Sequence, residues 1–120
     1  MSDHNWVVDL FTSIDEKDSE KFSSFLLEDC SFQFGNMPAV QGVDAISEFV
    51  GGFFVSIDSL KHELSDIWSV PGGVVCHGIV TYTRHDKSQL TIPFSNIFKV
   101  DDARVLDYQI FADTSQLYAQ

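Results

Sequence analysis

The residues best suited to proton transfer are an aspartate and a histidine in the second half of the chain. Asp113 follows the apolar Ile110 and Phe111. A carboxyl group among aromatic side chains has its pKa raised by desolvation, toward the range useful for acid/base catalysis. His77 has a parity that directs it inward from a neighbouring strand, where an imidazole beside a carboxylate makes a proton-shuttle pair. We therefore predict Asp113 as the acid/base and His77 as its partner; the alternatives are a strand-ending turn cap and a core histidine.

A second set of residues is suited to contacting a small ligand. His62 alternates with Leu60 and Leu64, so it either faces the interior or pairs with an acid on the surface. The chain contains eleven phenylalanines, enough to line a cavity as well as to fill a core. We predict a pocket with aromatic walls that include Trp68, Phe49 and Phe53, and core filling is the alternative for each of them.

Metal and nucleotide chemistry have no recognisable motif in this sequence. His62 and Asp66 would lie about 13 Å apart along a strand, which is too far for one ion. The chain contains no Gly-x-Gly-x-x-Gly loop and no Gly-x-Ser-x-Gly elbow. We therefore expect no metal and no cofactor.

Charge and composition exclude several classes of partner. The 120 residues suit one domain, covering 1–120, and the formal net charge is -11. Such a surface repels nucleic acid and anionic membranes. Because the first residues lack the basic region of a signal peptide, we expect a cytoplasmic protein with two buried free thiols, Cys30 and Cys76.

The hydrophobic pattern that positions these residues has a helical period in the first half of the chain and a period of two in the second half. Helical spacing predicts one helix over 6–14, a short second one over 22–26 and a long third one over 43–57, which we expect to be buried on more than one side. The pair Gly51-Gly52 inside the third helix indicates an early end or a closely packed neighbour. A short strand is expected over 30–34, between the second and third helices.

From Leu60 onward the period changes to two and predicts an antiparallel meander. Turn residues separate four runs, 60–70, 74–84, 89–100 and 105–113, and Pro93 indicates a bulge or bend. The strands carry apolar residues on both faces, so both faces need a cover. We expect helices on one face and a second copy of the chain on the outer one, giving a homodimer.

The order and spacing of these motifs carry a family resemblance over nearly the whole chain. The helix pair, the opening Gly42-Val43-Asp44-Ala45-Ile46, the long meander and the stretch Ile92 to Val100 leading to Asp107 to Asp113 resemble the SnoaL-like polyketide cyclase branch of the nuclear-transport-factor-2-like, or ketosteroid-isomerase-like, superfamily. The resemblance implies an α+β, cystatin-like conical barrel with N-terminal helices packed on a strongly curved, mostly antiparallel sheet. It also implies dimers and a deep apolar pocket.

The site positions of that superfamily are only partly occupied here. A ketosteroid isomerase has its general base where this chain has Phe34, and its second oxyanion group falls at Asn96, which could still donate a hydrogen bond. The Arg-x-Asp pair of the epoxide hydrolases of this fold is replaced by His77 and Ile79. The resemblance to the cyclases implies an acid/base role for Asp113, and Phe34 and Asn96 as ligand contacts.

Two functions follow from these observations. The first is a cofactor-free acid/base enzyme of the cyclase, isomerase or hydrolase type, acting on a small apolar molecule in a deep pocket. The second is a non-catalytic ligand-binding or dimerisation module of the same fold. They differ in whether a carboxyl group and a histidine meet inside the cavity.

Overall fold

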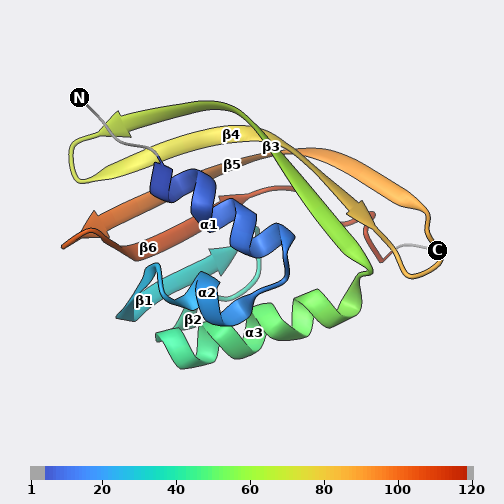
Figure 1. The fold of residues 1–120 in the computed structure, drawn as a ribbon, viewed down its shortest axis with the longest axis horizontal. Coiled ribbons are helices and arrows are strands. Elements are labelled where there is room, and N and C mark those ends of the chain that lie inside the picture. The colour runs from blue at the N-terminus through green and yellow to red at the C-terminus, as the bar shows by residue number, and fades with distance from the viewer. Residues whose placement is uncertain (1–4, 119–120) are drawn as a thin grey trace.

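The protein is a helix-covered, strongly curved sheet, as a computed structural model that describes residues 5–118 shows (Figure 1). The sheet has six strands in the order β2-β1-β6-β5-β4-β3. All neighbouring pairs are antiparallel except β1 and β6, which run parallel. Because β2 and β3 are its edges, the sheet does not close, and the α+β architecture expected from the sequence is confirmed.

Three helices cover the inner face of the sheet. Asp18 caps the N-terminus of the short second helix, since its side chain accepts a hydrogen bond of 3.0 Å from the backbone N–H of Lys21. Gly42 precedes the third helix with a positive φ of 90°, a conformation that side-chain-bearing residues rarely adopt. The helices are α1 (Asn5–Asp15), α2 (Ser19–Ser23) and α3 (Val43–Ser56).

The predicted meander forms the larger part of the sheet. Its four long strands pair in sequence order, and the short β2 continues the sheet beyond β1. The strands are β1 (Leu26–Phe34), β2 (Val40–Gln41), β3 (Ser59–Val70), β4 (Gly73–Thr83), β5 (Gln89–Asp101) and β6 (Arg104–Phe111). The last strand ends at Phe111, two residues earlier than the alternation predicts.

A bulge in β3 decides which side chains face the core. Leu64 pairs with Gly78, but the next pair is Asp66 with His77, so Ser65 is the extra residue. A one-residue shift moves every later side chain to the other face. Gly78 lies at the same place, and a Cβ there would collide with the backbone carbonyl of Glu63. No residue of β3 indicates this bulge in the sequence.

Pro93 lies in a regular part of the sheet, contrary to the expected bulge. The β4–β5 register runs through it without a shift, with Pro93 opposite Ile79. On the other side, β6 ends at Phe111, opposite Ser95. A proline whose nitrogen faces this open stretch removes no ladder hydrogen bond, which is why the strand tolerates it.

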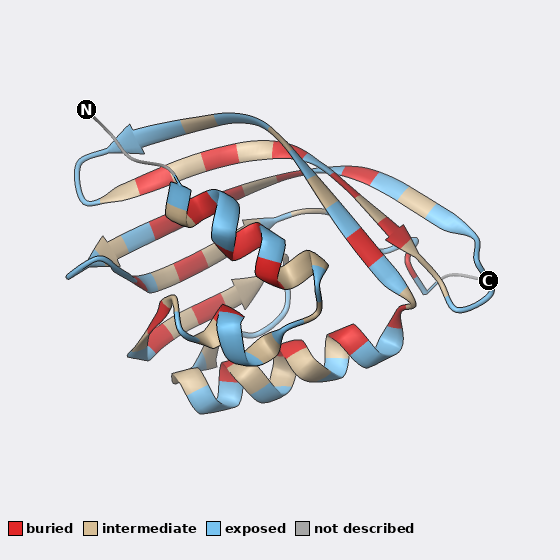
Figure 2. Ribbon diagram, viewed as in Figure 1, coloured by how far each residue is buried: buried red, intermediate tan, exposed pale blue. Residues whose placement is uncertain are grey.

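The core lies between the helices and the inner face of the sheet. Buried residues alternate along β4 and β5, as Figure 2 shows. Cys30 and Cys76 are both buried and free, as predicted, and burial raises the pKa of each thiol from 9.0 to about 12. Burial therefore holds both thiols in the protonated, less nucleophilic form at neutral pH.

Helix α3 differs from its prediction in two ways. It buries only one row of residues, Ile46, Val50 and Phe54, while Val55 on the opposite side is 77% exposed. The helix also continues through Gly51-Gly52 to Ser56, and a Cβ on either glycine would meet no atom within 4 Å. The glycine pair therefore marks neither an early end nor a close contact.

This geometry predicts that alanine stabilises the fold at both glycines. Each of Gly51→Ala and Gly52→Ala should raise the free energy of unfolding by about 1 kcal/mol, because alanine loses less backbone entropy in a helix and the methyl group has room. Urea unfolding at neutral pH measures this. Gly78→Ala is the matched contrast and should destabilise the protein, since its methyl group collides with the Glu63 backbone.

Candidate functional site

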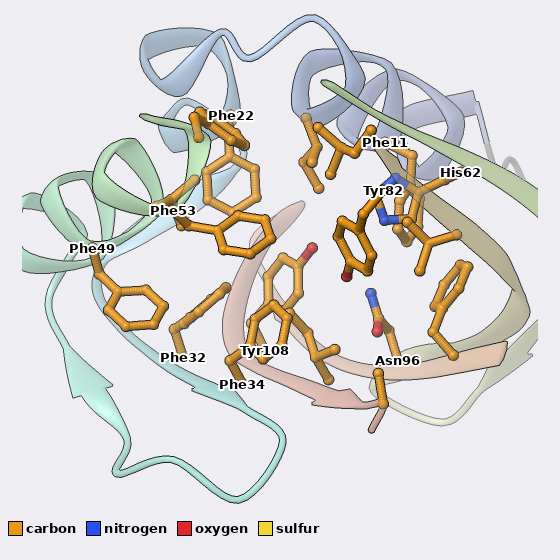
Figure 3. Close-up of a pocket in the computed structure, with 18 residues that line it drawn as sticks. Phe11, Phe22, Phe32, Phe34, Phe49, Phe53, His62, Tyr82, Asn96 and Tyr108 are labelled. Atoms are coloured by element: carbon orange, nitrogen blue, oxygen red, sulfur yellow. The ribbon is translucent and has the colours of Figure 1, made fainter. Parts of the chain in front are cut away.

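The main interior cavity lies between the helices and the inner face of the sheet (Figure 3). Its volume is about 50 Å³, roughly a third of the 150 Å³ or so that admits benzene. The walls are mainly aromatic and aliphatic, with four polar side chains among them. The lining residues are Phe11, Ile14, Phe22, Phe32, Phe34, Phe49, Val50, Phe53, Phe54, Leu60, His62, Val80, Tyr82, Phe94, Asn96, Tyr108, Ile110 and Ala112.

His62 is the titratable side chain of this cavity that has a charged partner. Its Nδ1 lies 2.6 Å from Oδ1 of Asp15, and its backbone N–H donates to Oδ2 of the same carboxylate at 3.0 Å. The two side chains are 10% and 24% exposed. Among residues 5–118, no hydrogen bond engages Nε2 of His62. In the neutral imidazole this geometry holds the proton on Nδ1 and leaves Nε2 as an acceptor at the cavity wall.

Three elements hold the imidazole in place. His62 precedes the β3 bulge and therefore shares the inner face with Leu60 and Leu64. Its ring packs against Phe11 of α1 and Phe94 of β5, at centroid distances of 4.8 and 5.2 Å, and these two rings also contact each other. The ring therefore has little freedom to rotate away from the cavity.

Asp15 occupies an unfavourable place for a carboxylate. It is the last residue of α1, where the helix dipole disfavours negative charge. The two hydrogen bonds from His62 compensate for this placement. The pair therefore joins the helical layer to the sheet as well as orienting the ring.

Asn96 supplies an unsatisfied acceptor in the same cavity. The residue is 2% exposed, and its Oδ1 is the buried side-chain atom of residues 5–118 that lacks a hydrogen-bond partner. A buried polar group without a partner costs about 1–3 kcal/mol. A ligand that donates a hydrogen bond to Oδ1 would remove that penalty.

Tyr82 and Tyr108 add two hydroxyl groups beside Asn96. Both side chains are buried, and no hydrogen bond engages either hydroxyl within the described chain. Burial raises the pKa of Tyr82 and holds that of Tyr108 well above 10.0, so both remain protonated donors at neutral pH. Figure 3 shows the two hydroxyls, the Asn96 amide nitrogen and the His62 ring turned toward the same space.

The predicted ligand contacts divide into two groups. Phe34, Phe49, Phe53, His62 and Asn96 all line the cavity. Trp68 does not: it is 49% exposed, because the Ser65 bulge turns it to the outer face of the sheet. The prediction of Trp68 as a pocket wall is wrong for that reason.

His77 also lies on the outer face and does not meet Asp113. Its Nε2 lies 2.9 Å from Oδ2 of Asp66, and its ring stacks on Trp68 with an interplanar angle of 15°. The side chains of His77 and Asp66 are 43% and 53% exposed. The expected pairing of His77 with Asp113 inside the cavity is therefore wrong.

Asp113 is an exposed turn residue, contrary to the expected pocket position. Ile110 and Ala112 face the cavity, and the alternation turns Asp113 outward. Its Oδ1 accepts a hydrogen bond of 3.0 Å from the backbone N–H of Ser115, which lowers its pKa where we expected a rise. Asp113 therefore matches the alternative given above, a residue that caps the turn at the end of the strand.

The sequence did not predict the roles of two residues at the site: Asp15, which binds His62, and Tyr82, which lines the cavity. Asp15 belongs to a charged run, Asp15 to Asp18, that reads as a simple helix break. An acid at a helix C-terminus was the available signal, because such a charge needs a partner. Tyr82 has the parity of Val80, opposite to that of His77, so the expectation that His77 faces inward placed Tyr82 on the wrong face.

Neither a metal centre nor a membrane span is recognised in the described part of the chain. Within residues 5–118, no three His, Cys, Asp or Glu side chains gather closely enough to hold an ion. No helix in that range has both the length and the apolar character to cross a bilayer.

Comparison with solved structures defines the class of fold. A protein from Jannaschia sp. CCS1 named for its likeness to SnoaL-like polyketide cyclases superposes with a TM-score of 0.80 at 16% identity, covering 92% of this chain and 85% of that one. An epoxide hydrolase of the LEH-like type from M. tuberculosis gives 0.79 at 12% identity, covering 93% and 83%. A protein with a ketosteroid isomerase-like fold from Catenulispora acidiphila DSM 44928, bound to trimethylamine, gives 0.85 at 10% identity, covering 95% and 89%. The chain thus has the ketosteroid-isomerase-like α+β fold.

The family follows from the sequence itself. The model of the SnoaL-like domain matches residues 7–108, which is most of the chain. The protein therefore belongs to the SnoaL-like domain family. No curated protein matches it in sequence.

The buried hydroxyl and thiol groups predict a loss of stability at alkaline pH. Tyr82, Tyr108, Cys30 and Cys76 have raised pKa values in the folded state, so the unfolded chain releases their protons first. The stability they contribute is complete below about pH 9 and is lost as pH rises toward 12. The urea midpoint should fall clearly between about pH 8 and about pH 10.5.

A single substitution separates titration from packing in that experiment. Tyr82→Phe keeps the ring and removes the buried hydroxyl, so the fall in midpoint between the two pH values should be smaller than in the unsubstituted protein. Each protein is compared with itself at the two pH values, so any effect of the substitution on packing cancels. An unchanged pH dependence in this variant would contradict the assignment.

Proposed function

We propose that the protein is an acid/base enzyme that acts on a small, mainly apolar molecule, with His62 as the proton-exchanging group. The observation that carries the proposal is the Asp15–His62 pair, at 2.6 Å, on the wall of an aromatic cavity. General acid/base catalysis requires a titratable group within reach of a bound ligand, and the other polar groups of the cavity are amide and hydroxyl groups. The reaction class is that of the notable relatives of this fold: cyclisation, isomerisation or hydrolysis without a cofactor.

The roles of the two side chains follow from their hydrogen bonds. Asp15 accepts from Nδ1–H and from the His62 backbone, so it is a positioning residue. Nε2 then accepts a proton from the ligand and returns it at another atom or to solvent. The imidazolium formed in between is stabilised by the Asp15 carboxylate, as in other histidine–carboxylate pairs.

The remaining polar groups indicate what the ligand carries. The hydroxyls of Tyr82 and Tyr108 can donate to a carbonyl oxygen or to the enolate that forms when its α-proton is removed. Asn96 Oδ1 needs a donor, which a ligand hydroxyl supplies. We infer a ligand with one carbonyl or enol oxygen and one hydroxyl group on an apolar frame.

A non-catalytic binding module is the second candidate. The exposed position of Asp113 favours it, because this removes the carboxylate expected at the centre of the site. In this case the cavity binds the same class of ligand and His62 serves as a hydrogen-bond partner only.

Exchange of an enolisable proton tests the proposal directly. The protein should speed the exchange of the α-protons of 2-tetralone, a small apolar ketone, into D2O, which NMR measures. His62→Gln should lower the rate by about 10²- to 10⁴-fold, the usual contribution of a general base. Asp15→Asn should lower it less, because Nε2 stays in the cavity and loses only its orientation.

The outer-face residues are the matched controls. His77→Gln and Asp113→Asn change the same residue types outside the cavity and should leave the exchange rate unchanged. A loss in Asp113→Asn together with full activity in His62→Gln would return the role to Asp113. Binding of 2-tetralone without any exchange would favour the binding module.

We also propose that residues 1–120 form one domain that acts in the cytoplasm and assembles as a homodimer through the outer face of the sheet. The register brings Trp68, Val75 and Ile97 side by side on that face, and Ile79 and Phe111 extend the patch. Trp68 and Phe111 are 49% and 52% exposed. A contiguous apolar patch of this kind is typical of a subunit interface.

Sedimentation equilibrium measures the assembly. The expected mass is twice the 13.5 kDa of the chain, and Ile97→Glu should give the monomer because it places a charge in the centre of the patch. Val55→Glu, on the exposed side of α3, is the control and should stay dimeric. A monomeric unsubstituted protein at tens of micromolar would contradict the proposal.

A further inference from the structure

The cavity is too small for the ligand class proposed above, but a second hollow adjoins it. An outer groove of about 310 Å³ is lined by Phe34, Met37, Phe49, Gly52, Phe53, Ser56, Thr114 and Tyr118. Phe34, Phe49 and Phe53 line the groove and the cavity alike. Together, these three rings form a wall between the two spaces, and their side chains are only partly buried.

Two of the three wall residues belong to α3, near its glycine pair. Phe49 comes just before Gly51-Gly52 and Phe53 just after it, and Figure 3 shows both rings turned from the helix toward the cavity. Consecutive glycines inside a helix reduce its rigidity. Because no neighbour fills the space beside either glycine, packing does not account for the pair. A bend at this point would move Phe53 relative to Phe49.

The end of α3 is held by the buried side chain of Phe54 and by a few polar contacts to distant segments. Nε2 of His85 donates to the carbonyl of Val55 at 2.8 Å, and Nζ of Lys17 donates to the carbonyl of Ile57 at 2.8 Å. The hydroxyl of Ser56 donates to the Phe53 carbonyl, so the bond of 2.6 Å between Ser56 and Tyr118 has Tyr118 as its donor. These bonds are exposed or partly buried, and such bonds break at low cost in free energy.

We propose that residues 53–56 form a movable wall hinged at Gly51-Gly52, whose outward displacement joins the groove to the cavity into one ligand site. The bound molecule places its polar end at His62 and Asn96 and extends its apolar part past Phe53 into the groove. This assigns an elongated molecule with one polar end as the ligand. The assignment rests on the proposed role of the cavity as a ligand site, whereas the mobility of the wall does not.

Amide hydrogen exchange tests the hinge without any ligand. In the unsubstituted protein, amides 53–56 should exchange at least about tenfold faster than amides 47–50. Gly51→Ala should slow exchange at 53–56 by at least about fivefold, since it stiffens the hinge and Gly51 lines neither the cavity nor the groove. Ser47→Ala strengthens the first half of the helix and should leave exchange at 53–56 unchanged. Equal slowing by both variants, or no slowing by Gly51→Ala, would overturn the hinge.

Binding of 2-naphthol, a fluorescent probe with a hydroxyl at one end of an apolar frame, tests the joined site. Gly51→Ala should raise its Kd by about fivefold, because it lowers the population of the open state. Tyr118→Phe removes the hydrogen bond that holds Ser56 in the closed state, so it should lower Kd. Ser47→Ala should leave Kd unchanged.

The two measurements separate the possible failures. Slowed exchange with an unchanged Kd in Gly51→Ala would overturn the claim that the wall controls the site. No binding of 2-naphthol to the unsubstituted protein would count against the proposed function and the joined site, and the exchange result would still decide the hinge.

Discussion

The extra residue at Ser65 in β3 is the constraint on which the rest of this structure depends. Before it, Leu60, His62 and Leu64 face the helices; after it, Asp66 and Trp68 face away from them. The shift also places Asp66 opposite His77, which gives the outer face its polar pair within an apolar surround. Because of this one extra residue, the first half of β3 directs His62 to the cavity, and the second half directs Trp68 to the outer, partly apolar face.

The Asp15–His62 pair carries the proposed chemistry of the inner face and also forms part of its architecture. It connects the end of α1 to the middle of β3 through two hydrogen bonds to one carboxylate. The Phe11 and Phe94 rings pack against the imidazole. A side chain on a strand that also connects two layers of the fold is held more rigidly than a loop residue would be, and such rigidity suits the proposed role of His62.

The unpaired polar groups and the glycine pair of α3 represent a departure from the best packing. Asn96 Oδ1 has no donor, and Gly51-Gly52 weaken a helix that has room for alanine at both places. Both features reduce stability, and proteins tolerate such costs mainly where a ligand or a movement needs them. Asn96 lines the aromatic cavity, and Gly52 lines the groove that shares Phe34, Phe49 and Phe53 with it, which links both features to one site.

The sequence by itself determined the fold class, the order of the elements, the division of each strand into two alternating faces and the burial of both cysteines, because these follow from local periodicity. It did not decide which face of β4 points inward, and the expectation that His77 does was wrong. Only the tertiary structure decided the partners. Asp15 and His62 are 47 residues apart, and a strand alternation cannot show that a helix end will reach it. The bulge at Ser65 reversed the prediction for Trp68, since one residue of register changes the face while leaving the hydrophobic pattern almost intact. Asp113 faces outward because the inward parity of the last strand belongs to Ile110 and Ala112.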